Sequence, residues 1–497
     1  MNSTHFPVYI MILLLACAIL IPFKKKTTGK GFMITMLSVL GVSLSMAIVE
    51  LIIVYNRSSP HSYTFGSYER GIGIEFLVDE FSALLTVIVL IISILIVLYS
   101  FRDLPHEIEP ARIPNYYTLL FLGLFAMIGI IFTNDIFNLY VFVEILSIVA
   151  IAIISIKNDK ATLMASMKYL IMGSIGSVSV LMGFAFIYMV TGHLNVTLIF
   201  EQINLVWEQY PLNILLAMGF ILTGFGIKVA IFPLHNWLPD AYSSAPSPSS
   251  AFLSGLIVKA YVFSVVKIIY RVIGNDVLQN IGVTNYIMIF GVLSMIMGSV
   301  FALTQTDLKR RLAYSSVAQI GYIFLGLGLA TELGMSSAFF HIVSHAFMKT
   351  ALFLSAGSII YLTGKRNVKD LNGIGYDIPI TMSVFMIGML GMIGIPGTSG
   401  FMSKWYLGVA VIDAGHIELL IVILLSSFLN ALYYFPIVVS AFLREKIESA
   451  PISDTKGIPL TMKLSMALLG FGIIIIGLFP NLIMNVIEQA IPTFVGQ

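Results

Sequence analysis

Four lysines and one glutamate lie inside long apolar stretches of the chain. The lysines are Lys228, Lys259, Lys349 and Lys404, and the acid is Glu144. A charged side chain at the centre of a bilayer costs about 2.5 kcal/mol or more, so residues of this kind usually line an ion path. We therefore expect these five residues to carry protons through a membrane.

Two histidines extend this set along one predicted helix. His341, His345 and Lys349 follow one another at intervals of four residues, which places them on one face of a helix. Histidines with this spacing can also bind zinc, but the zinc-protease motif has Glu after the first His, where this chain has Ile342, and no third ligand is evident. We predict no metal and no cofactor.

Glu144 and Lys228 are the acid and the base that we expect to form a switchable pair. In general, burial lowers the pKa of a lysine and a neighbouring carboxylate raises it. A paired lysine therefore stays charged, and separation from its carboxylate favours release of the proton. A purely structural buried ion pair is the alternative reading of the same two residues.

The composition requires a membrane. Of the 497 residues, 58% are hydrophobic and only 10% are charged, whereas a soluble domain has roughly 25% charged residues. The net charge of +2 gives no field that would attract nucleic acid. The one cysteine, Cys17, excludes a disulfide framework and cysteine-ligated zinc or iron–sulfur sites.

Hydropathy predicts an all-α polytopic membrane protein in which residues 1–497 form a single integral membrane domain. With about 20 apolar residues per span, we count about fourteen spans. They cover 5–23, 31–55, 76–101, 115–133, 135–156, 164–192, 211–238, 248–273, 281–304, 310–330, 334–362, 379–410, 415–443 and 459–490.

Positive charge predicts the orientation, because cytoplasmic loops hold an excess of Lys and Arg. No Lys or Arg precedes the first apolar stretch, which is typical of a first span with its N-terminus outside and not of a cleavable signal. We therefore expect both termini outside the cytoplasm. Loops on one side contain Lys24, Lys25, Lys26, Lys30, Arg102, Arg112, Lys157, Lys160, Lys309, Arg310, Arg311, Lys365, Arg366, Lys369, Arg444, Lys446 and Lys456, and the other side has Arg57, Arg70 and Arg271.

Charged residues near span ends have ordinary explanations. Lys168, Lys267 and Lys463 are expected to extend toward the membrane surface. The basic run Lys309–Arg311 is expected in a solvated loop.

Two predicted spans are interrupted by Gly and Pro beside a lysine. In the seventh, Lys228 is followed by Pro233, and in the twelfth Pro396 precedes Lys404. Proline removes a backbone donor and clashes with the preceding turn, so both helices should break. Paired broken helices that run in opposite directions point to a transport site built from inverted repeats, although Gly and Pro can also kink helices for packing alone.

Five stretches resemble a known family. They are NDIFNLYVFVEILSI (134–148), GFGIKVAIFPLHNWLPDAYSSAPSPSSAFLSGLIVKA (224–260), TDLKRRLAYSSVAQIGYI (306–323), HIVSHAFMKTALFLSAG (341–357) and GIPGTSGFMSKW (394–405). With them the whole chain resembles the antiporter-like membrane subunits of respiratory complex I, membrane-bound hydrogenases and Mrp-type multisubunit cation/proton antiporters.

The resemblance implies fourteen helices with two inverted five-helix repeats, spans four to eight (115–273) and nine to thirteen (281–443), and broken helices seven and twelve. It also implies a polar axis along the middle of the membrane. The family's functional positions fall on Glu144, Lys228, Lys259, His345 with His341 nearby, and Lys404. Lys349 and His235 are expected to extend the path.

The resemblance implies a proton-translocating subunit of a plasma-membrane complex. Its partners would be other membrane subunits and H⁺, with transport of Na⁺ left open. Length and Lys404 favour the Mrp-type D subunit, whereas the segment with His235 and Asp240 is closer to the hydrogenase and complex I branches, and both assignments stay open. We expect no catalytic site in this chain itself, although the complex could be redox-driven. A stand-alone secondary transporter is the alternative function.

Overall fold

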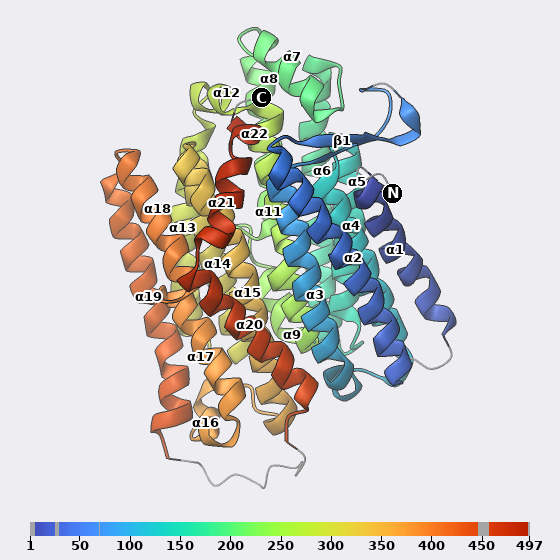
Figure 1. Cartoon of the computed structure of the whole chain (residues 1–497). Coiled ribbons are helices and arrows are strands. Elements are labelled where there is room, and N and C mark those ends of the chain that lie inside the picture. Colours follow the sequence, from blue (N-terminus) through green and yellow to red (C-terminus); the bar gives the residue numbers. More distant parts are fainter. Residues whose placement is uncertain (1–4, 25–28, 69, 446–456, 496–497) are drawn as a thin grey trace.

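The chain folds into a bundle of long helices with one short β-hairpin (Figure 1). The computed structural model describes residues 5–24, 29–68, 70–445 and 457–495. Within these residues, 12 helical segments are long and apolar enough to cross a membrane. They contain α1 (Phe6–Leu20), α2 (Lys30–Arg57), α3 (Glu80–Glu107), α4 (Ile113–Phe132), α5 (Ile136–Ser155), α6 (Lys160–Thr191), α8 (Pro211–Val229), α10 (Ser247–Phe252) continuous with α11 (Val258–Val266), α13 (Val283–Thr304), α15 (Glu332–Thr363), α19 (Ile417–Leu443) and α20 (Leu460–Leu478).

The two other predicted spans correspond to more polar or shorter helices. The tenth is α14 (Leu308–Gly328), which has 21 residues and a basic first turn. The twelfth is divided into α17 (Pro379–Ile393) and α18 (Ser399–Asp413), each of 15 residues. The last predicted span is also divided, because α20 ends at Leu478 and α21 (Asn481–Ala490) begins after Pro480. The short helices are α7 (Val196–Val206), α9 (Leu238–Ser244), α12 (Asn275–Asn280), α16 (Ile374–Asp377) and α22 (Pro492–Val495).

The two ends of the bundle differ. Strands β1 (His61–Thr64) and β2 (Glu75–Val78) pair antiparallel at the end where α7 and α22 also lie, which we call the hairpin end (Figure 1). Glu75 ties this hairpin to the helices, since its Oε2 accepts hydrogen bonds from Asn134 at 2.9 Å and from Asn195 at 2.7 Å. At the opposite end, which we call the basic end, α3 finishes at Glu107 and α14 begins at Leu308.

Three helical segments form the centre of the bundle. In the segment Ser247–Ile273 every residue of the most apolar 18-residue stretch is buried, and the corresponding share is 83% for both α3 and α15. By contrast, only 28% of that stretch is buried in α2 and 33% in α19, so these outer helices present apolar side chains to the surroundings. The ionisable residues on the central helices are therefore held away from lipid.

The expectation of a solvated loop at Lys309–Arg311 is wrong. The carboxylate of Asp307 caps α14 by accepting from the backbone N–H of Arg310 at 2.8 Å, so the helix starts before the basic run. This turn directs Lys309 and Arg311 inward, where Lys309 donates to the carbonyl of Ala245 at 2.6 Å.

Lys267 and Arg271 are also more buried than expected. Lys267 does not reach the membrane surface, because its amine donates to carbonyl groups at the C-terminus of α4, including Thr133 at 2.8 Å. Carbonyls at a helix end lack partners within the helix, and this lysine supplies one. Arg271 was expected in a loop, but it is buried and pairs with Asp79 at 2.9 Å.

Candidate functional site

The four lysines predicted from the sequence lie inside the bundle. The exposed fractions are 0% for Lys228, 2% for Lys259, 0% for Lys349 and 8% for Lys404. The side chain of Glu144 is 31% exposed. Four amines are thus buried within the helix bundle, and the one carboxylate is partly exposed.

Lys228 has three polar partners. Its Nζ donates to the hydroxyls of Ser147 at 2.6 Å and Ser177 at 2.7 Å, and it lies 3.2 Å from Oε1 of Glu144. Ser177 also donates to the same carboxylate oxygen of Glu144. The lysine can therefore keep two hydroxyl partners whether or not Glu144 remains beside it.

The break in helix seven determines where this amine lies. Helix α8 ends at Val229, one residue after Lys228, and Ala230 then adopts a left-handed conformation (φ 58°) ahead of Pro233. The indole N–H of Trp237 donates to the carbonyl of Ile227 at 2.7 Å, which satisfies one acceptor that the interrupted helix leaves free.

Close packing of α6 against α8 holds the pair together. A Cβ atom on Gly224 would lie 2.5 Å from the carbonyl oxygen of Gly176, and a Cβ on Gly176 would lie 3.0 Å from the carbonyl oxygen of Gly224. Only glycine allows the two backbones to approach this closely. The approach brings Ser177 of α6 within reach of Lys228.

Lys259 lies where the central segment departs from regular α-helix. Leu253–Ile257 and Lys267–Ile273 are π-helical turns on either side of α11. The Lys259 amine donates to the carbonyl oxygen of Ser254 in the first of these turns. Such turns free backbone groups for other partners and often occur at functional sites.

Helix α15 places two histidines and Lys349 in the same buried region. The ring centroids of His341 and His345 are 5.7 Å apart. Within the described residues, neither ring nitrogen of His345 has a hydrogen-bond partner. Lys349 donates to the carbonyl of Leu312 at 2.8 Å and to the hydroxyl of Ser315 at 2.5 Å.

Lys404 reaches back across the break in helix twelve. Helix α17 ends at Ile393, Pro396 lies in the connecting segment, and Lys404 is in the second turn of α18. Its amine donates to the carbonyls of Met392 and Ile393, both at 2.9 Å, and to the hydroxyl of Ser427 at 3.0 Å. The lysine thus binds the C-terminus of one half-helix from the other half.

Hydroxyl and ring contacts connect neighbouring members of the set. Ser147, a partner of Lys228, is 3.0 Å from the hydroxyl of Tyr261, two residues beyond Lys259 in α11. On the other side, Nδ1 of His341 is 2.8 Å from the hydroxyl of Ser403, which precedes Lys404.

Of the predicted residues, His235 lies apart from these contacts. It packs among aromatic rings, 5.6 Å from Phe301 and 5.9 Å from Tyr314 between centroids. Asp240, whose role the sequence left open, forms ion pairs with Lys168 at 2.7 Å and Arg310 at 2.9 Å.

Sequence reasoning missed the neutral partners of the lysines. Ser147, Ser177 and Ser315 each bind a lysine amine, and Gln319 is fully buried with both amide atoms unpaired among the described residues. Serines are common in membrane helices, so their types alone gave no signal. For Gln319, a polar amide within an apolar stretch was the available signal.

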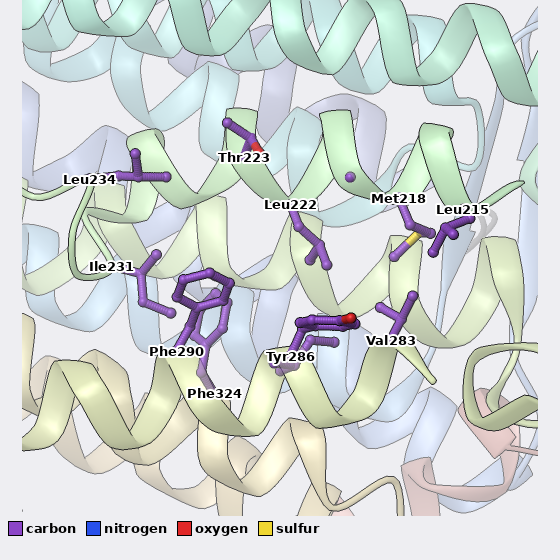
Figure 2. A pocket seen from close by; sticks show the side chains of 12 residues that line it. Leu215, Met218, Leu222, Thr223, Ile231, Leu234, Val283, Tyr286, Phe290 and Phe324 are labelled. Carbon is purple, nitrogen blue, oxygen red and sulfur yellow. The ribbon is translucent and has the colours of Figure 1, made fainter. Parts of the chain in front are cut away.

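One apolar cavity has a lining that includes none of these ionisable residues. It encloses about 340 Å³ between α8 and α13, and Figure 2 shows Leu222, Tyr286 and Phe290 lining it. Lining groups are almost all apolar, so the cavity offers no set of polar groups that would orient a solute. Among the described residues, no group of three or more His, Cys, Asp and Glu side chains is placed to hold a metal ion.

These features define a class: a polytopic membrane protein with two interrupted helices and buried amines and imidazoles, one of the amines being paired with a partly exposed carboxylate. Residues 133–430 match the family model described as NADH:quinone oxidoreductase/Mrp antiporter, TM. The chain belongs to this family, as the resemblance predicted.

Two curated relatives come from different branches of the family. The chain is 34% identical over 507 residues to NADH-quinone oxidoreductase subunit N of Desulforudis audaxviator, which covers 99% of both chains. It is 29% identical to the D subunit of the Na⁺/H⁺ antiporter of Alkalihalophilus pseudofirmus over 69% of this chain and 68% of the relative. Both are named as subunits of larger assemblies.

Solved structures share the fold. A chain of the Mrp complex from a Dietzia species superimposes with a TM-score of 0.89 at 23% identity, covering 100% of this chain and 98% of that chain. A chain of the archaeal membrane-bound sulfane sulfur reductase gives 0.88 at 29% identity, covering 99% and 97%. The predicted all-α polytopic membrane fold is confirmed, whereas the count of fourteen spans and the two inverted repeats stay predictions.

Proposed function

We propose that this chain translocates protons along the row formed by Glu144, Lys228, Lys259, His345, Lys349 and Lys404, as one subunit of a multisubunit membrane complex. The observation that carries the proposal is the ion pair between Glu144 and Lys228 at the break in α8. A buried charge pair is rarely a gain in stability over apolar packing, so a functional role explains its presence better than a structural one.

The pair can act as a switch because its two halves have different neighbours. Lys228 is fully buried, whereas the carboxylate of Glu144 is 31% exposed and lies on α5. If Glu144 turns away, the amine keeps Ser147 and Ser177 as partners but loses the charge that favours its protonated form. Release of a proton toward the next amine follows from that loss.

The second half of the row works without a paired carboxylate among the described residues. Lys259, Lys349 and Lys404 are held by backbone carbonyls and serine hydroxyls, with no carboxylate within ion-pair distance. Proton transfer between them needs water or hydroxyl groups as carriers, since each amine donates to a fixed acceptor. The histidines His341 and His345 lie between Lys259 and Lys404 and can relay a proton at either ring nitrogen.

The assembly context follows from the relatives. Because both named relatives are parts of larger complexes, we place this chain in a plasma-membrane antiporter or respiratory complex, with other membrane subunits as partners and both termini outside the cytoplasm. The alternative, a stand-alone transporter, would need a polar solute pocket, whereas the cavity between α8 and α13 is lined almost entirely by apolar groups.

Glu144→Gln tests the proposal. Glutamine keeps the length and hydrogen-bonding capacity of the side chain but cannot ionise. A single acid–base group typically contributes about a hundredfold or more to a rate. We therefore expect proton movement in vesicles containing the intact complex to fall at least tenfold. Glu201→Gln is the matched control, since Glu201 is exposed on α7 at the hairpin end. Wild-type transport by an assembled Glu144→Gln complex would contradict the proposal.

A further inference from the structure

A second cluster of ionisable side chains lies at the basic end of α3, apart from the row of lysines. Asp103 and Glu107 are one helical turn apart, and Glu107 forms an ion pair with Lys157. Lys309 of α14 lies beside both acids. We call these four residues the basic-end cluster.

The two acids of the cluster have different surroundings. The carboxylate of Glu107 already has two partners, because it pairs with Lys157 and its Oε1 accepts from the backbone N–H of Ser247 at 2.8 Å. Its side chain is 13% exposed. Asp103 is only 1% exposed; its carboxyl group lies against that of Glu107, and no other group in the described part of the chain donates a hydrogen bond to its Oδ2. One carboxylate therefore forms the outer edge of the cluster, and the other lies in the interior.

Further buried hydroxyls lie close to the cluster. The hydroxyls of Tyr116, Ser247 and Ser249 are buried; Tyr116 and Ser249 lie against each other and near Asp103, and the Ser247 hydroxyl has no partner within the described residues. An unsatisfied buried polar atom costs about 1–3 kcal/mol. Groups of such atoms are usually bonded to buried water, which makes this region the place for a water chain.

The helices that carry these hydroxyls lead to the lysines. Ser247 begins the continuous segment Ser247–Ile273, which contains Ser254 and Lys259, and a rise of about 1.5 Å per residue places Lys259 about 18 Å from Ser247. Between them, the Ser254 hydroxyl lies 3.1 Å from that of Ser316. The carbonyl of Ser254 binds Lys259 itself.

A second group of hydroxyls meets α15, the helix that carries Lys349. A Cβ atom on Gly357 would lie 2.7 Å from the hydroxyl oxygen of Tyr99 and 2.9 Å from that of Ser247, so both hydroxyls reach the same point of α15. The Tyr99 hydroxyl is also 3.1 Å from that of Ser358. Hydroxyls next to the cluster thus reach both helices that carry the central lysines.

We propose that the basic-end cluster is the proton-access site for this face of the membrane, with Asp103 as the group that takes up the proton. Water delivers a proton to the carboxylate of Asp103, where an O–H bond forms. That bond then breaks as the proton passes through the buried hydroxyls and their water to the neutral amine of Lys259, where an N–H bond forms. This step rests on the proposed function, since it supplies the row described above.

Asp103→Asn tests the step in vesicles that contain the intact complex. The amide preserves shape but cannot take up a proton, so transport should fall to about a tenth of wild type or less, with unchanged subunit levels, and Asp103→Glu should restore part of it. Glu109→Gln is the control, because Glu109 is a 73% exposed carboxylate at the same end. Wild-type transport by assembled Asp103→Asn overturns the proposal.

Water access is measured separately by cysteine labelling, which does not depend on Asp103 substitution. In a Cys17→Ser background, which removes the chain's one cysteine, Ser249→Cys should react with a small, charged thiol reagent applied to the basic end. Ser93→Cys is the control, since Ser93 is equally buried in α3 but donates to a carbonyl of its own helix. Equal reactivity of the two positions overturns the water path.

The same vesicles separate this inference from the proposed function. If Glu144→Gln is inactive while Asp103→Asn transports normally, the row carries protons but they enter elsewhere. If Glu144→Gln itself transports normally, the proposed function fails first.

Discussion

The amine of Lys404 lies 2.9 Å from the carbonyl oxygen of Ile393, the last residue of the preceding half-helix. The Lys404 amine can therefore have two separate roles, one structural and one in proton transfer. As a donor, it satisfies carbonyls that the break in helix twelve leaves without helical partners. As an amine, it can give up a proton.

Two substitutions of Lys404 separate these roles. Lys404→Arg keeps the donors that bind Met392 and Ile393, but a guanidinium stays protonated at any accessible pH, so this variant should assemble normally and transport nothing. Lys404→Met loses both roles, and the unpaired carbonyls should lower stability by about 1–3 kcal/mol. Thermal unfolding of the purified complex and proton movement in vesicles measure the two effects. Transport by the Arg variant at the wild-type rate would make Lys404 a purely structural residue.

Gly224→Ala adds only one methyl group, but it should destabilise the protein clearly. The added methyl group would lie 2.5 Å from the carbonyl oxygen of Gly176, so α6 and α8 must move apart, at a cost of about 1–3 kcal/mol. That movement also draws Ser177 away from Lys228, so transport should fall with stability. Gly219→Ala on the same helix is the control, because a Cβ there meets nothing within 4 Å. Equal melting temperatures of the two variants would contradict the close approach.

The sequence was informative where an ionisable residue stood in an apolar stretch. Lys228, Lys349 and Glu144 were found in this way because burial of charge in a membrane leaves few explanations. The same reasoning failed for Lys267 and Lys309. A charged residue near the end of a predicted span gives the same sequence pattern whether its side chain points outward or binds a buried helix end. Contacts such as Lys404 with Met392 could not be predicted, since they depend on where two half-helices meet in space.

The isolated chain should transport little. The relatives are subunits of complexes, the Glu144 side chain is 31% exposed, and α6, which carries its partner Ser177, exposes apolar side chains such as Met167 and Ile171. Contact with a neighbouring subunit would close this side and hold the switch. Reconstitution of the purified chain in liposomes, compared with the intact complex at equal protein, measures the difference. Saturable cation/proton exchange by the chain alone would show that no partner is needed.

The ion pair of Arg271 with Asp79 should be essential for stability at the hairpin end. Arg271 is 2% exposed, lies 2.9 Å from the carboxylate, and stacks 3.8 Å from the ring centroid of Phe494 in α22. Arg271→Met leaves a buried carboxylate unpaired, which typically costs about 3–5 kcal/mol, whereas removal of both charges is often close to neutral. We therefore expect the single variant to unfold at a markedly lower temperature and the double variant Arg271→Met/Asp79→Asn to recover most of the loss. Arg57→Met, at an exposed arginine of the same end, should leave the melting temperature unchanged. If Arg271→Met melts at the same temperature as the Arg57→Met control, the ion pair contributes nothing to stability. If the double variant melts no higher than Arg271→Met, the lost stability comes from the packing of the arginine against Phe494.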